Sequence, residues 1–427
     1  MSLWRQSAWY ALGNLWAAVL QLLISALLIR QLGIVAFGEW LLAWTVVMLC
    51  SLASSGIGPV MSLRLQSADK ALHRASVLRD ASESTLLLAT ILCFPAITWL
   101  EHARGATPAL SGGTWWWLLV PCQVLANEAV ALSAAALRSL GDYRTGALSQ
   151  MVARTLWTLG LLAMAHHAPR LDAMLFVTAT CTIGQALWQF WRLQLAGLTL
   201  TRAPGAPPRR WAALFDLARW QWLKAVSEML YLLADRLLIN AFLGPAMLAV
   251  YVVCLQLTEP LSRIAGLLSQ PLLLWAGRLR DGLHAASEGL VVVFALQLFV
   301  LLAGLALCIA GPRLLPLWLP GSENQYAAAL LVAVMAATLT SLHAVANELQ
   351  TGLGMLRRLA WTNFAGALLA LTAMGFAVHQ GLEQVMLARC LFGLCLAMTW
   401  PALWRRLRTP THALAPVSSP VKRALHK

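Results

Sequence analysis

The chain has 427 residues, of which 60% are hydrophobic and only 11% are charged. Ordinary soluble domains carry about 25% charged residues, so this composition excludes a water-soluble globular protein. The formal charge of +14 does not indicate nucleic-acid binding either, because the basic residues lie between apolar segments rather than on one solvated face.

Apolar runs long enough to cross a bilayer recur along the whole chain. A spanning helix needs roughly 20 apolar residues, and twelve such runs can be found. The first six are approximately Tyr10–Ile29, Gly38–Val60, Thr85–Leu100, Trp115–Leu137, Ala147–Met164 and Met174–Leu193. The other six are Trp222–Leu243, Met247–Trp275, Gly289–Ala310, Ala327–Leu349, Leu359–Val378 and Val385–Trp404. The sequence therefore predicts an all-α integral membrane protein with about twelve transmembrane helices.

The basic residues between these runs predict the orientation. Most of the 31 Lys and Arg residues fall on the side of the N-terminus, whereas the opposite loops hold only Arg30, Arg104, Arg170 and Arg313. Lys and Arg are enriched in cytoplasmic loops. We therefore expect both termini in the cytoplasm, and a multi-pass protein of the bacterial cytoplasmic (inner) membrane.

A break near the midpoint divides the spans six and six. Residues 203–210 contain three prolines, which a helix interior does not tolerate. Motifs also recur across this break: Leu32-Gly33 as Leu243-Gly244, and Leu140-Gly141 as Leu353-Gly354. We expect an N-terminal six-helix lobe over 1–200, a basic linker over 201–221, a C-terminal lobe over 222–404 and a basic tail over 405–427. An even number of spans per half makes the halves parallel repeats, which enclose a central cavity.

Nine ionisable residues fall inside the spans. Each costs about 2.5–3.5 kcal/mol at the centre of a bilayer, so they must be paired, hydrated or close to an end. They are Glu128, Arg154, Glu228, Asp235, Arg236, Glu259, Arg263, Glu348 and Arg389. Arg154, Glu228 and Asp235 are the strongest functional candidates. Glu259 with Arg263 also fits a structural ion pair, and Arg236, Glu348 and Arg389 also fit snorkelling toward helix ends.

Polar residues at helical spacing extend this pattern. Glu228, Tyr231 and Asp235 form one stripe on the seventh span, and Pro260 invites a kink in the eighth. Further stripes hold Asn14, Gln21 and Ser25 on the first span, and Gln150, Arg154 and Thr158 on the fifth. We interpret these stripes as the lining of a shared, water-accessible interior.

Several classes of chemistry have no supporting motif. The eight cysteines lie in apolar segments without a C-x-x-C pair, so neither disulfides nor a metal site is indicated. No phosphate-binding loop, nucleophile elbow or zinc motif occurs, and we assign no catalytic residues.

Four segments resemble a known family. Arg30-Gln31-Leu32-Gly33 through Phe37-Gly38 is similar to the turn after the first helix of Wzx or PST-type polysaccharide flippases, which belong to the multidrug/oligosaccharidyl-lipid/polysaccharide (MOP, MATE-like) exporter superfamily. Ser55-Gly56-Ile57-Gly58 resembles the end of their second helix. The loop at residues 137–143 and the segment from Asp235-Arg236 to Val250-Tyr251 are also similar to theirs. The order and spacing of these motifs carry the resemblance.

The resemblance implies a flippase that works by alternating access. Such proteins move an undecaprenyl-diphosphate-linked oligosaccharide from the cytoplasmic to the periplasmic leaflet for surface polysaccharide, such as lipopolysaccharide or exopolysaccharide. No cofactor is implied, although H+ or Na+ could be coupled. The expected partners are membrane lipid, the polyprenyl-diphosphate-linked oligosaccharide and other membrane proteins of polysaccharide assembly. Only Asp235 and Arg236 match a family motif.

These roles distribute over the intramembrane charges as a hypothesis. Diphosphate binding is assigned to Arg154, Arg263, Arg236 and Arg389, and ion coupling to Glu228, Asp235, Glu259, Glu128 and Glu348. The polar lining is assigned to Asn14, Gln21, Ser25, Gln150 and Tyr231. Two alternatives remain: a MATE-like, cation-coupled drug or metabolite antiporter, and a membrane glycosyl- or acyltransferase, for which no catalytic constellation is found.

Overall fold

The computed structural model describes most of the chain. The described residues are 3–52, 55–58, 61–62, 65, 71–103, 115–167, 169–198, 211–280, 286–319 and 325–408. The expected Pro-rich segment at 203–210 and most of the basic tail, from residue 409 on, lie outside them. All elements within these ranges are helices.

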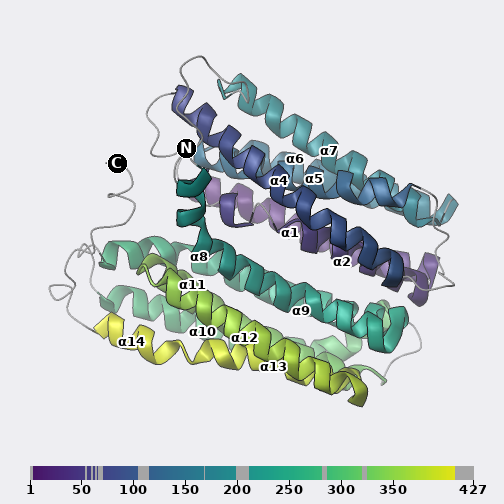
Figure 1. The fold of residues 1–427 in the computed structure, drawn as a ribbon. Coiled ribbons are helices and arrows are strands. Elements are labelled where there is room, and N and C mark those ends of the chain that lie inside the picture. The colour runs from purple at the N-terminus through teal and green to yellow at the C-terminus, as the bar shows by residue number, and fades with distance from the viewer. Residues whose placement is uncertain are drawn as a thin grey trace.

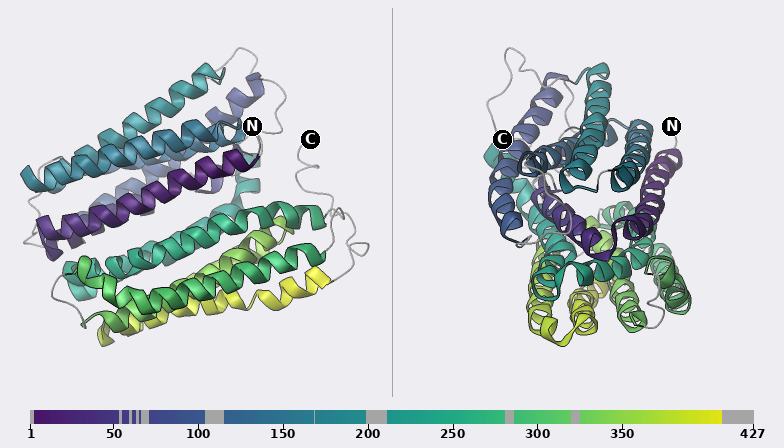
Figure 2. Two further views of the ribbon diagram at one scale, coloured as in Figure 1. Left: turned by 180° about the vertical axis from the view of Figure 1, so that it is seen from behind. Right: turned by 90° about the vertical axis from the view of Figure 1, so that its right-hand side faces the viewer.

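The helices form two groups (Figure 1). The N-terminal group contains α1 (Leu3–Leu32), α2 (Ile34–Cys50), α4 (Ala71–Ala103), α5 (Trp116–Ser139), α6 (Tyr143–His167) and α7 (Leu171–Leu195). The C-terminal group contains α8 (Trp211–Met229), the π-helical turn η1 (Leu230–Ala234), α9 (Asp235–Arg280), α10 (Ala286–Leu314), the 3-10 turn η2 (Leu315–Leu317), α11 (Ala327–Gly352), α12 (Leu356–Ala377), the 3-10 turn η3 (Val378–Gln380), α13 (Leu382–Ala397) and α14 (Trp400–Arg408). The two groups lie one against the other when viewed along the helices (Figure 2).

The prediction of an all-α membrane protein with about twelve spans is confirmed. Eight described helical segments are long and apolar enough to cross a membrane. One of them, Arg219–Ser269, has 51 residues and contains two spans, which are separated at Gly244. The remaining spans correspond to the shorter apolar helix α2 and to α4 and α6, whose polar ends extend beyond the apolar runs. The chain is thus a multi-pass membrane protein.

The recurring Leu-Gly pairs adopt matching backbone conformations. Gly33, between α1 and α2, has φ 80° and ψ 164°, and Gly244 has φ 85° and ψ 173°. Gly141 and Gly354 follow α5 and α11 with φ values of 80° and 76°. The first pair occupies a region essentially restricted to glycine. The repeat seen in sequence is therefore also a repeat of turns.

The two groups share a hydrophobic core where α2 packs against α9. Phe37, Trp40 and Val47 of α2 lie in the same buried cluster as Tyr251 and Cys254 of α9. The backbones approach so closely that a Cβ at Gly38 would lie 1.9 Å from the carbonyl oxygen of Pro245. Because α2 is buried between the groups, its side chains are apolar almost throughout, and its central part lies in the interior rather than in lipid.

A second set of contacts joins the groups at the expected outer end. The Trp318 indole donates hydrogen bonds to the Leu22 carbonyl (3.0 Å) and to Ser25 Oγ (3.1 Å). Arg30 Nη2 donates to the Leu317 carbonyl at 3.0 Å. Side chains that the sequence marked as interfacial thus connect the two groups.

Candidate functional site

The N-terminal group encloses a polar cavity of about 320 Å³. This volume lies at the lower end of the range for ligand pockets. Five helices contribute its walls, with Asn14 from α1, Trp44 from α2, and most of the lining from α5, α6 and α7. The lining includes two guanidinium groups, those of Arg138 and Arg154, and contains no carboxylate among the described residues. The cavity is therefore a place for an anion or a strongly polar group.

Arg154 is the charged group deepest along α6. It lies eleven residues after Tyr143, which corresponds to roughly 16 Å along the helix axis, so it sits near the middle of the membrane. Its guanidinium carbon is 5.2 Å from the centroid of the Trp157 ring, a cation–π distance. No carboxylate among the described residues lies within ion-pair distance of it. Its charge is stabilised by an aromatic face and remains available to a ligand.

Amide and hydroxyl side chains build the wall behind this cavity. Gln123 Nε2 donates to Asn127 Oδ1 at 2.9 Å and to Thr182 Oγ1 at 3.0 Å. Ser133 Oγ donates to Gln189 Oε1, and Gln189 Nε2 donates to Ser149 Oγ, each at 2.7 Å. These bonds connect α5, α6 and α7 and hold the polar wall in a fixed geometry.

The pair formed by Glu259 and Arg263 faces this region from α9. Arg263 Nη2 lies 2.6 Å from Glu259 Oε1, and the two side chains are 34% and 42% exposed. Both charges are close enough to Arg154 to act on it. The helix does not break at Pro260, because Gly244 is the non-helical position within α9. The two groups thus present a cation and an ion pair toward each other.

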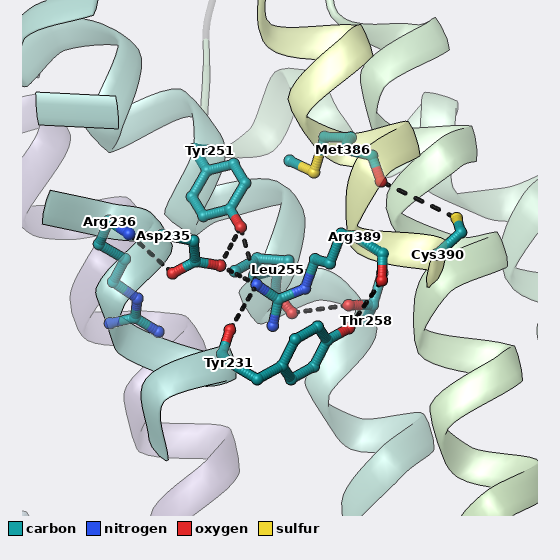
Figure 3. A network of polar contacts seen from close by, with 9 residues as sticks. All are labelled: Tyr231, Asp235, Arg236, Tyr251, Leu255, Thr258, Met386, Arg389 and Cys390. Carbon is teal, nitrogen blue, oxygen red and sulfur yellow. Dashed lines mark hydrogen bonds and ion pairs between the residues drawn. The ribbon is translucent and has the colours of Figure 1, made fainter. Parts of the chain in front are cut away.

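A second cluster is buried inside the C-terminal group (Figure 3). Arg389 of α13 forms an ion pair with Asp235 of α9 and donates to the Tyr251 hydroxyl at 2.7 Å. The Tyr251 hydroxyl also donates to Asp235, whose other oxygen accepts the Arg236 backbone N–H at 2.7 Å. Asp235 and Tyr251 are fully buried. Both carboxylate oxygens therefore have partners, and the cluster fastens α13 to α9.

Tyr231 completes this cluster. The guanidinium carbon of Arg389 lies 4.2 Å from the Tyr231 ring centroid, and the ring stacks on Phe392 at 3.9 Å. Arg236 lies beside the cluster and within electrostatic range of Glu259. Through Arg236 and Glu259, a series of charged side chains leads from the buried cluster to Arg154.

The expected stripe on the seventh span is divided by the π-helical turn η1. Tyr231 and Asp235 face Arg389, whereas Glu228 lies 3.5 Å from Lys224 on α8. Five residues in π-helical conformation change the angular position of everything before them, so Glu228 turns away from Asp235. Glu348 of α11 lies within electrostatic range of Lys224 and Glu228, which places these three charges in one neighbourhood.

The remaining candidates have varied surroundings. Asn14 and Gln150 line the cavity, as the stripes predicted. Ser25 is buried and accepts the Trp318 hydrogen bond instead, and Gln21 is partly exposed on α1. Glu128 of α5 is buried within range of Cys50 and Cys93.

Several residues of the site were missed by the sequence interpretation. Arg138 was counted with the cytoplasmic loops, yet it lines the cavity. Gln123, Asn127, Gln185 and Gln189 were overlooked because attention rested on charges. Their signal was present: amides recur on one face of the fourth and sixth spans, at spacings of four residues.

Comparisons with known proteins show what this fold is similar to. No protein-family model matches the chain, and no curated protein does. Among solved structures, an inward-facing multidrug resistance MATE family transporter of the MOP superfamily aligns with a TM-score of 0.68 and 13% identity, over 95% of this chain and 96% of that one. Its outward-facing form gives 0.68, 13%, and 96% of both chains. A MATE in complex with MaL6 gives 0.65 and 14%, over 94% and 95%. The chain has the fold of MATE transporters.

Proposed function

We propose that this protein is a flippase that moves a lipid-linked oligosaccharide, carried on a polyprenyl diphosphate, from the cytoplasmic to the outer leaflet of a bacterial cytoplasmic membrane. The observation that carries this proposal is the cavity whose described lining has two arginines and no acid. Arginine binds phosphate oxygens through two parallel hydrogen bonds and stays charged at any physiological pH. An anionic headgroup suits such a cavity better than a cation does.

The fold supports transport by alternating access. Two six-helix groups of the same design can rock against each other around a site between or within them. An inside-negative membrane potential contributes about 2.3 kcal/mol per charge per 100 mV. Two negative charges moving outward would therefore gain about 4–5 kcal/mol per 100 mV, which is a sufficient driving force without a cofactor.

Coupling to H+ or Na+ remains part of the proposal. The five acids assigned to it differ in accessibility. Glu228 and Glu259 are 38% and 42% exposed, whereas Asp235 and Glu128 are buried. Glu228 and Glu259 are thus the acids that can exchange an ion without first breaking a buried cluster.

The test uses a fluorescent polyprenyl-diphosphate oligosaccharide in proteoliposomes, with an impermeant quencher added outside. Hydrogen bonds to charged groups contribute about 1.5–3 kcal/mol, so Arg154→Gln should slow flipping by about tenfold or more. The matched control is Arg170→Gln, because Arg170 pairs with Asp172 at the start of α7 and lies outside the cavity. Flipping at the wild-type rate in Arg154→Gln contradicts the proposal.

A MATE-like antiporter is the second candidate, favoured by the titles of the structures that match. It would export a cationic or neutral compound in exchange for H+ or Na+. Efflux of a cationic dye from cells, driven by an imposed ion gradient and lost with the transporter, would favour this function. Dye efflux without any lipid flipping would replace the flippase proposal.

A further inference from the structure

The interior of the C-terminal group contains polar atoms that the protein itself does not satisfy. The buried side-chain atoms without a hydrogen-bond partner among the described residues belong mainly to this group; they include those of Arg236, Asn240, Gln256, Trp275, His343, Asn347, Gln350 and Asn363. In the N-terminal group they are Thr85 Oγ1 and Gln123 Oε1. Burying such atoms without a partner is costly. Their concentration in one group indicates that something else fills the space beside them.

His343, Asn347 and Gln350 lie on one face of α11. Their spacings of four and three residues place them one above the other. Both ring nitrogens of His343 and both amide atoms of Gln350 lack partners, so turning the ring or the amide over would not satisfy them. His343 is 5% exposed and Gln350 is fully buried. These two residues therefore establish the unsatisfied face independently of how the amides are assigned.

The repeat places this face opposite the same helix that forms the cavity wall in the N-terminal group. With the register fixed by Gly141 and Gly354, Asn363 of α12 takes the position of Gln150, which lines the cavity. In the same register, His343 and Asn347 take the positions of Val130 and Ala134, which also line it. The C-terminal group thus has its own counterpart of the cavity, lined by longer polar side chains.

Charged groups lie at this face. Lys224 of α8 acts electrostatically on both His343 and Glu348, and Glu348 is also within range of Glu228. The helices packed against α11 carry further charges with described side chains: Glu259 and Arg263 on α9, Arg313 on α10, Arg357 and Arg358 on α12, and Glu383 and Arg389 on α13. Of all these, Lys224 is the one that acts on His343.

We propose that this part of the C-terminal group is a hydrated proton site centred on His343. Water molecules satisfy the unpartnered atoms of His343, Asn347 and Gln350. A hydronium ion in this water gives its proton to an imidazole nitrogen and leaves as water, and the imidazolium returns the proton to water or to the Glu348 carboxylate. A nearby ammonium and imidazole make a metal cation an unsuitable occupant, whereas a proton requires only the groups present.

This site goes beyond the proposed flippase function and does not depend on it. Imidazole is the side chain that changes charge most readily near neutral pH. In a two-group transporter, a charge gained between α8, α11 and α12 would alter the packing of the C-terminal group alone. The site therefore offers the protein a way to respond to a proton gradient.

The experiment is nuclear magnetic resonance of the full chain, labelled with 15N-histidine, in lipid nanodiscs. His343→Gln assigns the signal by removing it. If that variant fails to assemble, Asn363→Leu assigns the signal independently, because it perturbs the histidine nearest α12. We expect magnetisation transfer from water to the His343 ring, and a change from the neutral to the imidazolium spectrum between about pH 8 and pH 5.

Two outcomes overturn the inference: absence of water contact at His343, or a ring that stays neutral over this range. Gln350→Leu should weaken the transfer from water, because it removes two of the unsatisfied atoms. Arg154→Gln should leave the His343 spectrum unchanged. A normal His343 spectrum in a protein that fails to flip lipid would therefore count against the proposed function and not against the proton site.

Discussion

Replacement of Arg389 by leucine perturbs the buried cluster shown in Figure 3. The variant leaves Asp235 as a carboxylate with 0% exposure and without its cation. It also removes the donor to the Tyr251 hydroxyl and the cation that lies 4.2 Å from the Tyr231 ring. Leucine has a similar reach and fits the apolar surroundings, so loss of charge is the main change.

The expected loss follows from the burial of the pair. Removing one partner of a buried ion pair costs about 3–5 kcal/mol, because the remaining charge is uncompensated. For a folding unit of the size of the C-terminal group, 1 kcal/mol corresponds to about 2–4 °C in melting temperature. The variant should therefore melt about 6–20 °C below the wild type. A double replacement, Asp235→Leu with Arg389→Leu, should recover much of the loss.

Thermal unfolding of the detergent-solubilised protein, followed by size-exclusion chromatography after heating, measures these differences. Arg358→Leu is the matched control, because Arg358 is an exposed residue at the start of α12 and its loss should change stability by at most about 0.5 kcal/mol. Coupling between Arg389 and Asp235 is obtained from the double-mutant cycle. A wild-type melting temperature for Arg389→Leu, or additive losses in the double variant, would refute the reasoning.

Three further substitutions test the packing between and within the groups. Gly38→Ala should prevent close packing of α2 on α9 and lower the yield of folded protein, because its Cβ would lie 1.9 Å from a backbone oxygen; Gly146→Ala, with nothing within 4 Å, should be tolerated, and equal yields would contradict the interface. Gly33→Ala and Gly244→Ala should each destabilise by about 1–3 kcal/mol, because alanine is strained at these dihedral angles; two unchanged melting curves would count against the paired turns. Trp318→Phe should remove about 1 kcal/mol of contact between the groups, seen as faster labelling of a cysteine introduced at Leu317, and unchanged labelling would show that this contact does not hold that end closed.

The sequence alone determined the number of spans and the helical class. These follow from apolar length, which the thickness of the bilayer sets for every helix in the same way. The repeat was also visible, because Gly33 and Gly244 must be glycine wherever the chain takes their dihedral angles. Orientation remains a prediction from the Lys and Arg distribution. The substrate remains a prediction from the resemblance.

Partnership among the charged residues was decided by the tertiary structure. The spacing of Glu228, Tyr231 and Asp235 predicted one stripe, but the π-helical turn separates Glu228 from the other two. Arg389 and Glu348 were candidates for snorkelling, yet Arg389 is buried against Asp235 from the far end of the chain. Periodicity describes one helix at a time and contains no information about which helix lies opposite. An arginine inside a membrane protein is therefore visible in sequence, whereas its role as a partner in a buried pair or as the lining of a cavity depends on how the helices pack.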